Sequence, residues 1–255
     1  MLLHLKRSTI LSKAYISITD VADIFPANNT YVSERQKDGE KMNYKYVVWD
    51  WNGTLFDDVQ ISVDAVNYML EKTGYKNRVD VKLYKEIFRF PVSDYYISAG
   101  FDFAKHSFDE LAKIYVYIYT KLQYTANLNK EAKEVLKKLN SFGVNQIIVS
   151  ACEKNRLKNQ IEKFKIADEF AEILGIDDDY AVGKVDIAKK WFAQNNIDAK
   201  EVLFVGDTDH DLEVANAVGC DCVFVSFGHQ SKKRLSKFNI PILDSLNEVA
   251  DYILS

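Results

Sequence analysis

The sequence predicts an α/β fold: a Rossmann-like parallel sheet with helices on both faces and an inserted all-helical segment. Short apolar runs typical of buried strands alternate with helical patterns from about residue 126 to the end. One earlier apolar run, YVVWD, ends at residue 50, and the stretch from about 59 to 125 that follows it has helical patterns. Strands alternating with helices form βαβ units, whose parallel sheet is covered on both faces.

The individual elements follow from these patterns in chain order. After the strand at 46–50, further strands are expected at residues 144–150, 170–176, 201–207 and 221–226. Helices are expected at residues 60–73, 130–141, 153–164, 185–196, 211–219 and 244–254. The segment KIYVYIYTKL at 113–122 also suits a strand, because it is rich in aromatic and β-branched residues. A helix is predicted there, since no turn signals bound it closely.

Length and composition bound the class of protein. The chain has 255 residues, 47% of them hydrophobic, which is enough for one large domain or a core with an insertion. Its net charge of −4, without long runs of one sign, argues against a nucleic-acid or membrane-surface partner. No apolar run is long enough to span a bilayer. The three cysteines do not form a disulfide framework, so a reducing, cytoplasmic location is expected. Nothing in the sequence fixes the oligomeric state.

The first 41 residues differ from the rest. A helical pattern up to residue 25 stops at Pro26, and a polar, linker-like stretch follows. We expect an N-terminal extension at 1–41 that is dispensable or reflects an upstream start codon, an α/β core at 42–58 and 126–255, and a helical cap at 59–125. A targeting peptide is the alternative for the extension, because residues 1–19 hold no acid and several Ser, Thr and Lys.

Polar side chains stand where the predicted strands end. Asp50 ends the first strand, Ser150 the second, and GDTDHD, with Asp207, Asp209 and Asp211, the fourth; Lys184 stands just before the helix that follows the third. Ligands of such sheets bind at the carboxyl ends of the strands, so these groups are expected to converge.

Each of these groups has a chemical use at one site. Clustered carboxylates repel one another unless a hard cation such as Mg²⁺ neutralises them, and Mg²⁺ also accepts phosphate oxygens. A hydroxyl, an ammonium group and backbone N–H groups at a helix start bind phosphate. A carboxylate beside the phosphorus can attack it to form an aspartyl phosphate.

With these motifs in order, residues from about 45 to 230 resemble the haloacid dehalogenase superfamily, in its phosphoglycolate phosphatase-like branch with a helical (C1-type) cap. The family's Asp-x-Asp-x-Thr motif is matched by Asp50-Trp51-Asn52-Gly53-Thr54, and its Gly-Asp-x-x-x-Asp motif by Gly206 to Asp211. IIVS and GKVD match the other two motifs.

The resemblance implies a Mg²⁺-dependent hydrolase of a small phosphorylated metabolite. Asp50 would be the nucleophile and a metal ligand, in a catalytic set with Asn52, Thr54 and Lys184. Asp207, the backbone of Asn52 and Asp211 would complete the metal site, Asp211 as a ligand or as an acid behind the ligands. Ser150, Ala151 and Lys184 would hold the phosphate; Lys165 and Lys189 are competitors for the lysine.

Asn52 departs from the family pattern. The phosphatases of the family use an Asp at this position as general acid and base, and an amide does not titrate. Three accounts remain open: a phosphatase in which another group replaces the acid, with Asp57, Asp58 and cap residues as candidates; a phosphate-ester-binding or regulatory protein with weak turnover; and activity from a fraction deamidated at the Asn52–Gly53 pair. Acyl and aryl phosphates need no acid, because their leaving groups have a low pKa.

The cap is expected to set the substrate. FRFPVSDYYISAGFDF at 88–103 is aromatic, and these residues either form the cap's own core or contact the substrate. Arg89 is a candidate to hold a substrate carboxylate, as a phosphoglycolate-like substrate would require. His210 and His229 flank the site in sequence and are expected to lie behind it or in solvent. Carbon–phosphorus cleavage would need a cap lysine, for which Lys72, Lys76, Lys82 and Lys85 are available.

Overall fold

The computed structural model describes residues 44–177 and 183–255, which belong to one compact unit spanning Glu40–Ser255. The expectations for residues 1–41 lie outside the described residues. Among the helices of the described ranges, none is long and apolar enough to cross a membrane.

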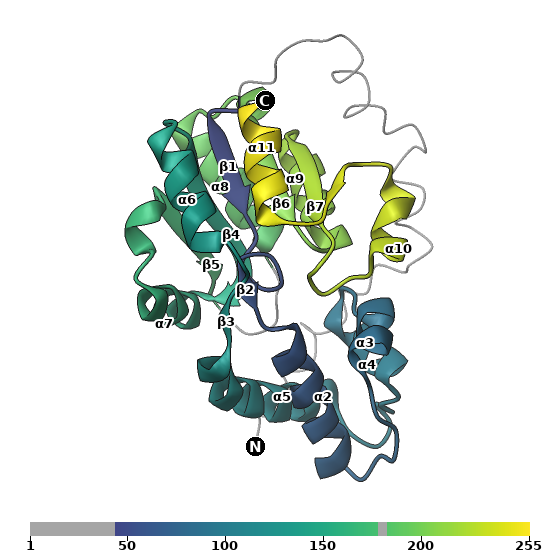
Figure 1. The fold of residues 1–255 in the computed structure, drawn as a ribbon. Helices are drawn as coiled ribbons and strands as arrows, with labels where there is room; N and C mark the ends of the chain where they lie inside the picture. Colours follow the sequence, from purple (N-terminus) through teal and green to yellow (C-terminus); the bar gives the residue numbers. More distant parts are fainter. Residues whose placement is uncertain (1–43, 178–182) are drawn as a thin grey trace, which may run out of the picture. The chain divides into compact units, whose positions relative to one another are not determined.

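Six parallel strands form the central sheet, in the order β5-β4-β1-β6-β7-β8 (Figure 1). They are β1 (Tyr46–Trp49), β4 (Asn145–Glu153), β5 (Glu172–Ile176), β6 (Val202–Gly206), β7 (Asp221–Val225) and β8 (Ile242–Leu243). In the centre, Val48 of β1 is paired with Ile147 of β4 and Phe204 of β6. The first motif, which follows β1, therefore lies between the second motif on β4 and the fourth motif after β6.

Helices cover both faces of the sheet, as the alternating pattern predicts. One face is covered by α6 (Ala132–Ser141), α7 (Lys154–Phe164) and α11 (Leu246–Leu254), whose buried residues pack against the sheet. The other is covered by α8 (Lys184–Asn195), α9 (Asp209–Val218) and the short α10 (Lys232–Leu235). Val47 and Trp49 pack on the first face and Val48 on the second, because successive strand side chains alternate. Single 3₁₀ turns are η1 (Gln123–Thr125), η2 (Ala167–Glu169), η3 (Ala199–Glu201) and η4 (Ser236–Phe238).

A helical insertion separates β1 from β4. It consists of α2 (Val59–Lys72), α3 (Val81–Ile87), α4 (Val92–Ala99) and α5 (Phe108–Leu122). The short strands β2 (Phe56–Asp57) and β3 (Asn127–Leu128) pair antiparallel and join the two ends of the insertion (Figure 1). The insertion has its own apolar core, which includes Met69, Leu70 and Leu111. The predicted α/β fold with a helical insert is thus confirmed.

The ambiguous segment at 113–122 is helical, as predicted. It is the C-terminal part of α5, whose first turn is capped by the Ser107 side chain accepting a hydrogen bond from the Glu110 amide. The prediction that the second strand ends at Ser150 was wrong. β4 continues to Glu153 after an irregularity that begins beyond Val149. The two-residue strands β2, β3 and β8 were not predicted, because they are too short to show a period.

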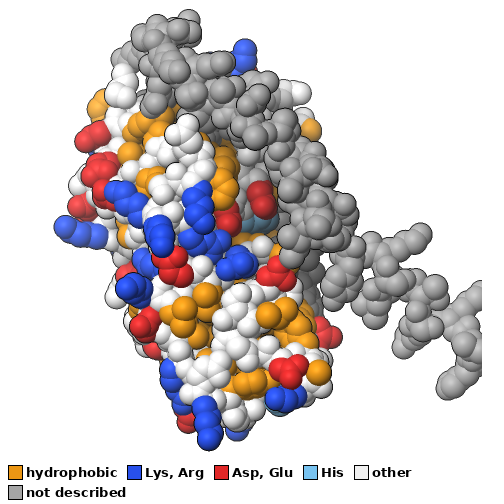
Figure 2. Space-filling view, turned by 90° about the vertical axis from the view of Figure 1, so that its right-hand side faces the viewer, with side chains coloured by type: hydrophobic (Ala, Val, Ile, Leu, Met, Phe, Trp, Pro, Cys, Tyr) orange, Lys and Arg blue, Asp and Glu red, His pale blue; other side chains and the backbone are white. Residues whose placement is uncertain are grey.

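The face shown in Figure 2 mixes both signs of charge. Lys and Arg side chains gather across its middle with Asp and Glu beside them, and apolar side chains lie over the lower part. Among the described residues, the large exposed hydrophobic side chains include Leu83 and Ile97 of the insertion.

Candidate active site

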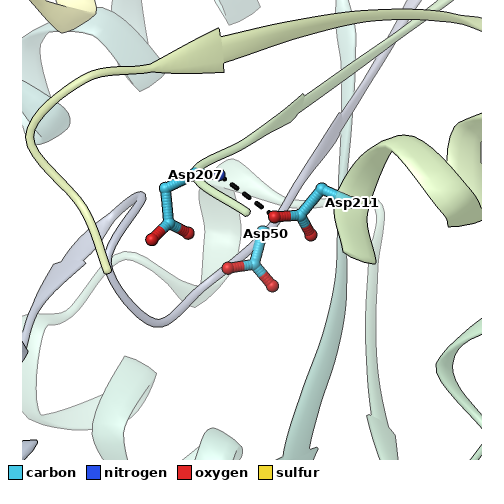
Figure 3. A group of neighbouring side chains, drawn as sticks. All are labelled: Asp50, Asp207 and Asp211. Atoms are coloured by element: carbon cyan, nitrogen blue, oxygen red, sulfur yellow. Dashed lines mark hydrogen bonds between the residues drawn. The ribbon is translucent and has the colours of Figure 1, made fainter. Parts of the chain in front are cut away.

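Three aspartates gather at the carboxyl ends of β1 and β6. Asp50 follows β1, Asp207 follows β6, and Asp211 lies in the first turn of α9 (Figure 3). One carboxylate oxygen of each lies within 4.8 Å of the others, and all three residues are buried. Neighbouring parallel strands end at one edge, so residues far apart in sequence meet there as predicted.

Lys184 bridges two of these carboxylates. Its Nζ donates to Oδ1 of Asp50 at 2.5 Å and to Oδ1 of Asp211 at 2.6 Å. The residue begins α8 and is 2% exposed. Burial disfavours its charge, but the two carboxylates outweigh burial and raise the pKa of Lys184. The competing Lys165 and Lys189 are exposed, so the structure brings Lys184 alone of the three to the carboxylates.

Asp211 is held mainly by its own helix start. Its Oδ2 accepts hydrogen bonds from the backbone amides of Asp207 and Thr208, and from the Thr208 hydroxyl, at 2.8 to 3.1 Å. Together with Lys184 these donors occupy both oxygens. Asp211 therefore fixes the turn and positions Lys184, while Asp50 and Asp207 keep more of their acceptor capacity for a cation.

The turn after β1 lies tightly against Asp207. The Thr54 hydroxyl donates to Oδ1 of Asp207 at 3.1 Å. Gly53 has φ +75°, and a Cβ placed on it would lie 2.3 Å from Oδ2 of Asp207. A Cβ placed on Gly228 would lie 2.2 Å from the same oxygen. Only glycine fits these two positions without displacing the carboxylate.

Burial and neighbouring carboxylates disfavour the charged forms of Asp50 and Asp207. Burial raises the pKa of Asp50 well above its usual range; Lys184 opposes this, and Asp211 and Asp207 add to it. Burial also raises the pKa of Asp207, to about 6, against the charge of His229. A hard divalent cation would relieve this repulsion, and carboxylate oxygens are the ligands it prefers. The donor set therefore fits Mg²⁺.

A second buried network surrounds Asn52. Its Nδ2 donates to Oδ2 of Asp58 at 2.8 Å and to the Tyr119 hydroxyl at 2.9 Å. Tyr119 in turn donates to Oδ2 of Asp58 at 2.6 Å. The other Asp58 oxygen accepts from the Gly53 amide at 3.0 Å and faces Nε2 of His229 at 3.2 Å. The network joins the first motif to α5 and to the loop after β7.

The charges of Asp58 and His229 support each other. Burial would raise the pKa of Asp58, but His229 and the hydrogen bonds from Tyr119 and Asn52 lower it. Burial would lower the pKa of His229, but Asp58 and then Asp207 raise it to about 9. Nδ1 of His229 is engaged by the Tyr84 hydroxyl at 2.9 Å, so both ring nitrogens have partners. The pair is a buried ion pair between the residue that precedes α2 and the loop after β7.

A cavity of about 170 Å³ lies between these groups and the insertion. Its core side includes Asp50, Ser150, Ala151, Lys184 and Asp207. Ser150 is 1% exposed, and its hydroxyl accepts a hydrogen bond from the Cys152 amide at 3.1 Å. The predicted phosphate-binding and metal-binding residues thus face one space.

The insertion forms the opposite wall, and it is aromatic. Its lining residues are Ser62, Tyr84, Phe88, Phe90, Val92, Tyr95, Tyr96, Phe108, Ala112, Tyr115, Val116 and Tyr119. Tyr95 and Tyr96 also belong to the insertion's own core. The aromatic stretch at 88–103 therefore contributes both to this core and to the cavity wall.

Some predicted candidates lie elsewhere. Arg89 donates to the carbonyl oxygen of Ile87 at 3.1 Å and does not line the cavity. The four cap lysines do not line it either, which leaves no amine from the insertion for carbon–phosphorus chemistry among the described residues. Asp57 is exposed, whereas its neighbour Asp58 is 2% exposed and lines the cavity.

The structure gives His229 a place that the sequence did not. We expected it behind the site or in solvent; it is 5% exposed, lines the cavity and holds Asp58. Its backbone amide also donates to Oδ2 of Asp207 at 2.5 Å. The signal in the sequence was its position three residues after the fifth strand run, at the carboxyl edge of the sheet.

The sequence resembles those of known proteins. The family of haloacid dehalogenase-like hydrolases matches residues 47–225. The chain is 25% identical to a phosphoglycolate phosphatase of Pseudomonas savastanoi pv. phaseolicola, over 80% of this chain and 78% of that protein. It is 24% identical to a phosphoglycolate phosphatase of Psychrobacter arcticus, over 84% of this chain and 97% of that protein.

Solved structures share the fold. A predicted phosphatase from Clostridium acetobutylicum superposes with a TM-score of 0.71 at 22% identity, covering 83% of this chain and 99% of that one. The family match spans the part of the chain that contains the three aspartates and Lys184. The chain belongs to the haloacid dehalogenase-like hydrolases.

Proposed function

We propose that the protein is a Mg²⁺-dependent phosphatase that hydrolyses a small phosphorylated metabolite through an aspartyl phosphate on Asp50. One observation carries the proposal: three buried aspartates and Lys184 meet at the end of the sheet, in the same cavity as Ser150. The helical segment at 59–125 acts as a cap on the core formed by 42–58 and 126–255.

Asp50, Asp207 and the backbone carbonyl of Asn52 would hold the Mg²⁺, with Asp211 as a further ligand or as the group that orients Lys184. When bound, the cation neutralises the carboxylates and the phosphate oxygens. The Ser150 hydroxyl and the Ala151 backbone would bind the phosphate. The Lys184 ammonium group, which contacts Asp50, would also stabilise the negative charge of the transferred phosphoryl group.

The chain's own steps follow from this placement. A carboxylate oxygen of Asp50 attacks the phosphorus, and the bond from phosphorus to the ester oxygen breaks. The ester oxygen leaves with the electron pair and takes its proton from water, because Asn52 cannot supply one. Water then attacks the phosphorus of the aspartyl phosphate, which releases phosphate and restores Asp50.

Asn52 favours a second candidate function, a phosphate-ester-binding protein with weak turnover. General acid catalysis is typically worth about 10²–10⁴-fold in rate, and Asn52 offers none. Its amide is held by Asp58 and Tyr119. The metal and phosphate ligands do not depend on this side chain, so binding would persist where turnover is slow.

The substrate is a separate question. The curated relatives are named for phosphoglycolate, whose carboxylate calls for a cation beyond the phosphate site. Arg89, our candidate for that role, does not line the cavity, whereas Arg156 of α7 does. We therefore propose the reaction that these relatives carry out without assigning their substrate.

The test measures phosphate release from acetyl phosphate and phenyl phosphate with Mg²⁺, with EDTA, and by Asp50→Asn. We expect release by the wild type with Mg²⁺ alone, a loss of at least about 10³-fold in Asp50→Asn, and a phosphoryl adduct on the peptide that contains Asp50. Lys189→Gln, an exposed change, is the matched control and should keep full activity.

Two results would contradict this proposal. Turnover that persists in Asp50→Asn would exclude an aspartyl phosphate at this residue. Saturable Mg²⁺-dependent binding of methylphosphonate by a protein that releases no phosphate from either ester would support the binding protein instead.

A further inference from the structure

The insertion's wall of the cavity carries no charge. Of the residues from α2 to α5 that line the cavity, all are apolar or aromatic except Ser62. The aromatic rings contact one another and the core: Phe88 lies 5.3 Å from Tyr95 and 5.0 Å from His229, and Phe90 lies 4.6 Å from His210, between ring centroids. A wall of this kind favours an apolar, flat group next to the phosphate.

Two residues that line the cavity, one in the insertion and one in α9, each have a polar atom without a hydrogen-bond partner among the described residues. The hydroxyl of Tyr95 and Nε2 of His210 are buried and make no hydrogen bond to any described residue. Both residues line the cavity. Buried polar groups are nearly always hydrogen-bonded, because leaving one unpaired is costly. No hydrogen bond within the described residues therefore competes for these two atoms.

The two atoms differ in what they offer. Nδ1 of His210 lies 2.8 Å from a Glu213 oxygen, and a carboxylate can only accept, so the ring proton is on Nδ1. In the neutral ring Nε2 is then an acceptor. The Tyr95 hydroxyl both donates and accepts. A hydroxyl or amino substituent on a ligand ring satisfies either atom.

The lack of a general acid at position 52 limits which phosphate esters the site can cleave. Without a proton from Asn52, the leaving oxygen must depart as an anion. A phenol has a pKa of about 10, whereas an alkoxide is nearly as basic as hydroxide and is a far poorer leaving group. An aryl ester therefore transfers its phosphoryl group with far less need of an acid.

From these observations we infer that the cavity takes a phosphate monoester of an aromatic hydroxyl compound. Its ring packs against Phe88, Phe90 and Tyr95, and a hydrogen-bonding ring substituent reaches Tyr95 or His210. The inference rests on the proposed function for the position of the phosphate. In the reaction, the bond from Asp50 to phosphorus forms, the bond from phosphorus to the aryl oxygen breaks, and the phenolate takes a proton from water.

Binding of phosphonates, which are not hydrolysed, tests the ligand class apart from turnover. Dissociation constants are measured by calorimetry with Mg²⁺ for methylphosphonate, phosphonoacetate, phenylphosphonate and 4-hydroxyphenylphosphonate. We expect phenylphosphonate to bind at least about tenfold more tightly than methylphosphonate or phosphonoacetate, and the hydroxylated ring more tightly still.

Two variants assign the preference to the wall. Phe90→Ala should reduce the ratio between phenylphosphonate and methylphosphonate by about tenfold. Tyr95→Phe should reduce the ratio between the hydroxylated and the plain ring by about three- to tenfold. Tyr68→Phe, an exposed tyrosine of α2, is the control and should leave all ratios unchanged. Thermal melting checks that each variant is folded.

The outcomes separate this inference from the proposed function. Phosphate release without a preference for aryl ligands overturns the inference and leaves the phosphatase. A preference for aryl ligands without phosphate release supports the inference and favours the binding protein. If phosphonoacetate binds most tightly, or if no phosphonate binds in the presence of Mg²⁺, the inference is overturned.

Discussion

The side-chain amide of Asn52 donates a hydrogen bond to the Asp58 carboxylate at 2.8 Å, beside the cavity that Asp50 lines. The amide cannot exchange a proton with a leaving group. Asp58 is a poor acid as well, because His229 and its hydrogen-bond donors outweigh burial and lower its pKa. The pair thus replaces a titrating acid with a fixed, ionised network.

Asn52→Asp should create an acid here. Two buried carboxylates at hydrogen-bond distance cannot both ionise, so the pair would retain a proton near the cavity at neutral pH. We expect turnover of an alkyl ester such as β-glycerophosphate to rise by about 10²-fold, and that of phenyl phosphate by less than about tenfold. The measurement is kcat for both esters.

An equal gain on the two esters would mean that the new carboxylate does not act on the leaving oxygen. Peptide mass analysis of the wild type serves as the control. Intact Asn52 throughout an active sample excludes a deamidated fraction as the source of activity.

Asp58→Asn should destabilise the fold. The change leaves a buried, charged His229 without its carboxylate, and breaking a buried pair in this way costs about 3–5 kcal/mol. Asp57→Asn is a matched control, since the neighbouring side chain is exposed, and should stay within about 0.5 kcal/mol of the wild type. Urea denaturation measures both. Similar free energies of unfolding for the two variants would show that the ion pair contributes little.

Two buried tyrosines of the cavity wall should respond differently to loss of the hydroxyl. Tyr119→Phe removes a donor to Asp58 and an acceptor for Asn52, at a cost of about 1–3 kcal/mol. Tyr95→Phe removes a hydroxyl without a partner among the described residues, so its free energy of unfolding should be unchanged or higher. Equal losses in the two melting curves would mean that the Tyr95 hydroxyl has a partner in solution.

Gly53→Ala should disturb the cation site as well as the fold. A left-handed φ costs alanine about 1–2 kcal/mol, and here the Cβ would also collide with Asp207. Gly74→Ala is the control: its φ of +82° carries the same strain, but nothing lies within 4 Å of the added carbon. We expect Mg²⁺ to raise the melting temperature of the wild type and Gly74→Ala, but not of Gly53→Ala. Retention of the shift in Gly53→Ala would show that Asp207 has room to move.

Much of the fold follows from local signals. Apolar runs and helical periodicity locate the long strands and helices because each signal is contained within one element. The placement of Asp50, Ser150 and Asp207 in or just after apolar strand runs, and of Lys184 just before a helix, then predicts their meeting, since parallel strands end at one edge. The short β2–β3 pair could not be predicted in this way, because two residues are too few to show a period.

The sequence by itself determined the α/β sheet, the helical insertion and the carboxylate cluster at the sheet edge. Only the tertiary structure decided that Asp58 rather than Asp57 faces Asn52, that His229 is buried against Asp58, and that Arg89 does not line the cavity. These contacts join the first motif to α5 and to the loop after β7, across large separations in sequence. Which side chains meet there depends on how the insertion packs over the sheet, and no local pattern encodes that packing.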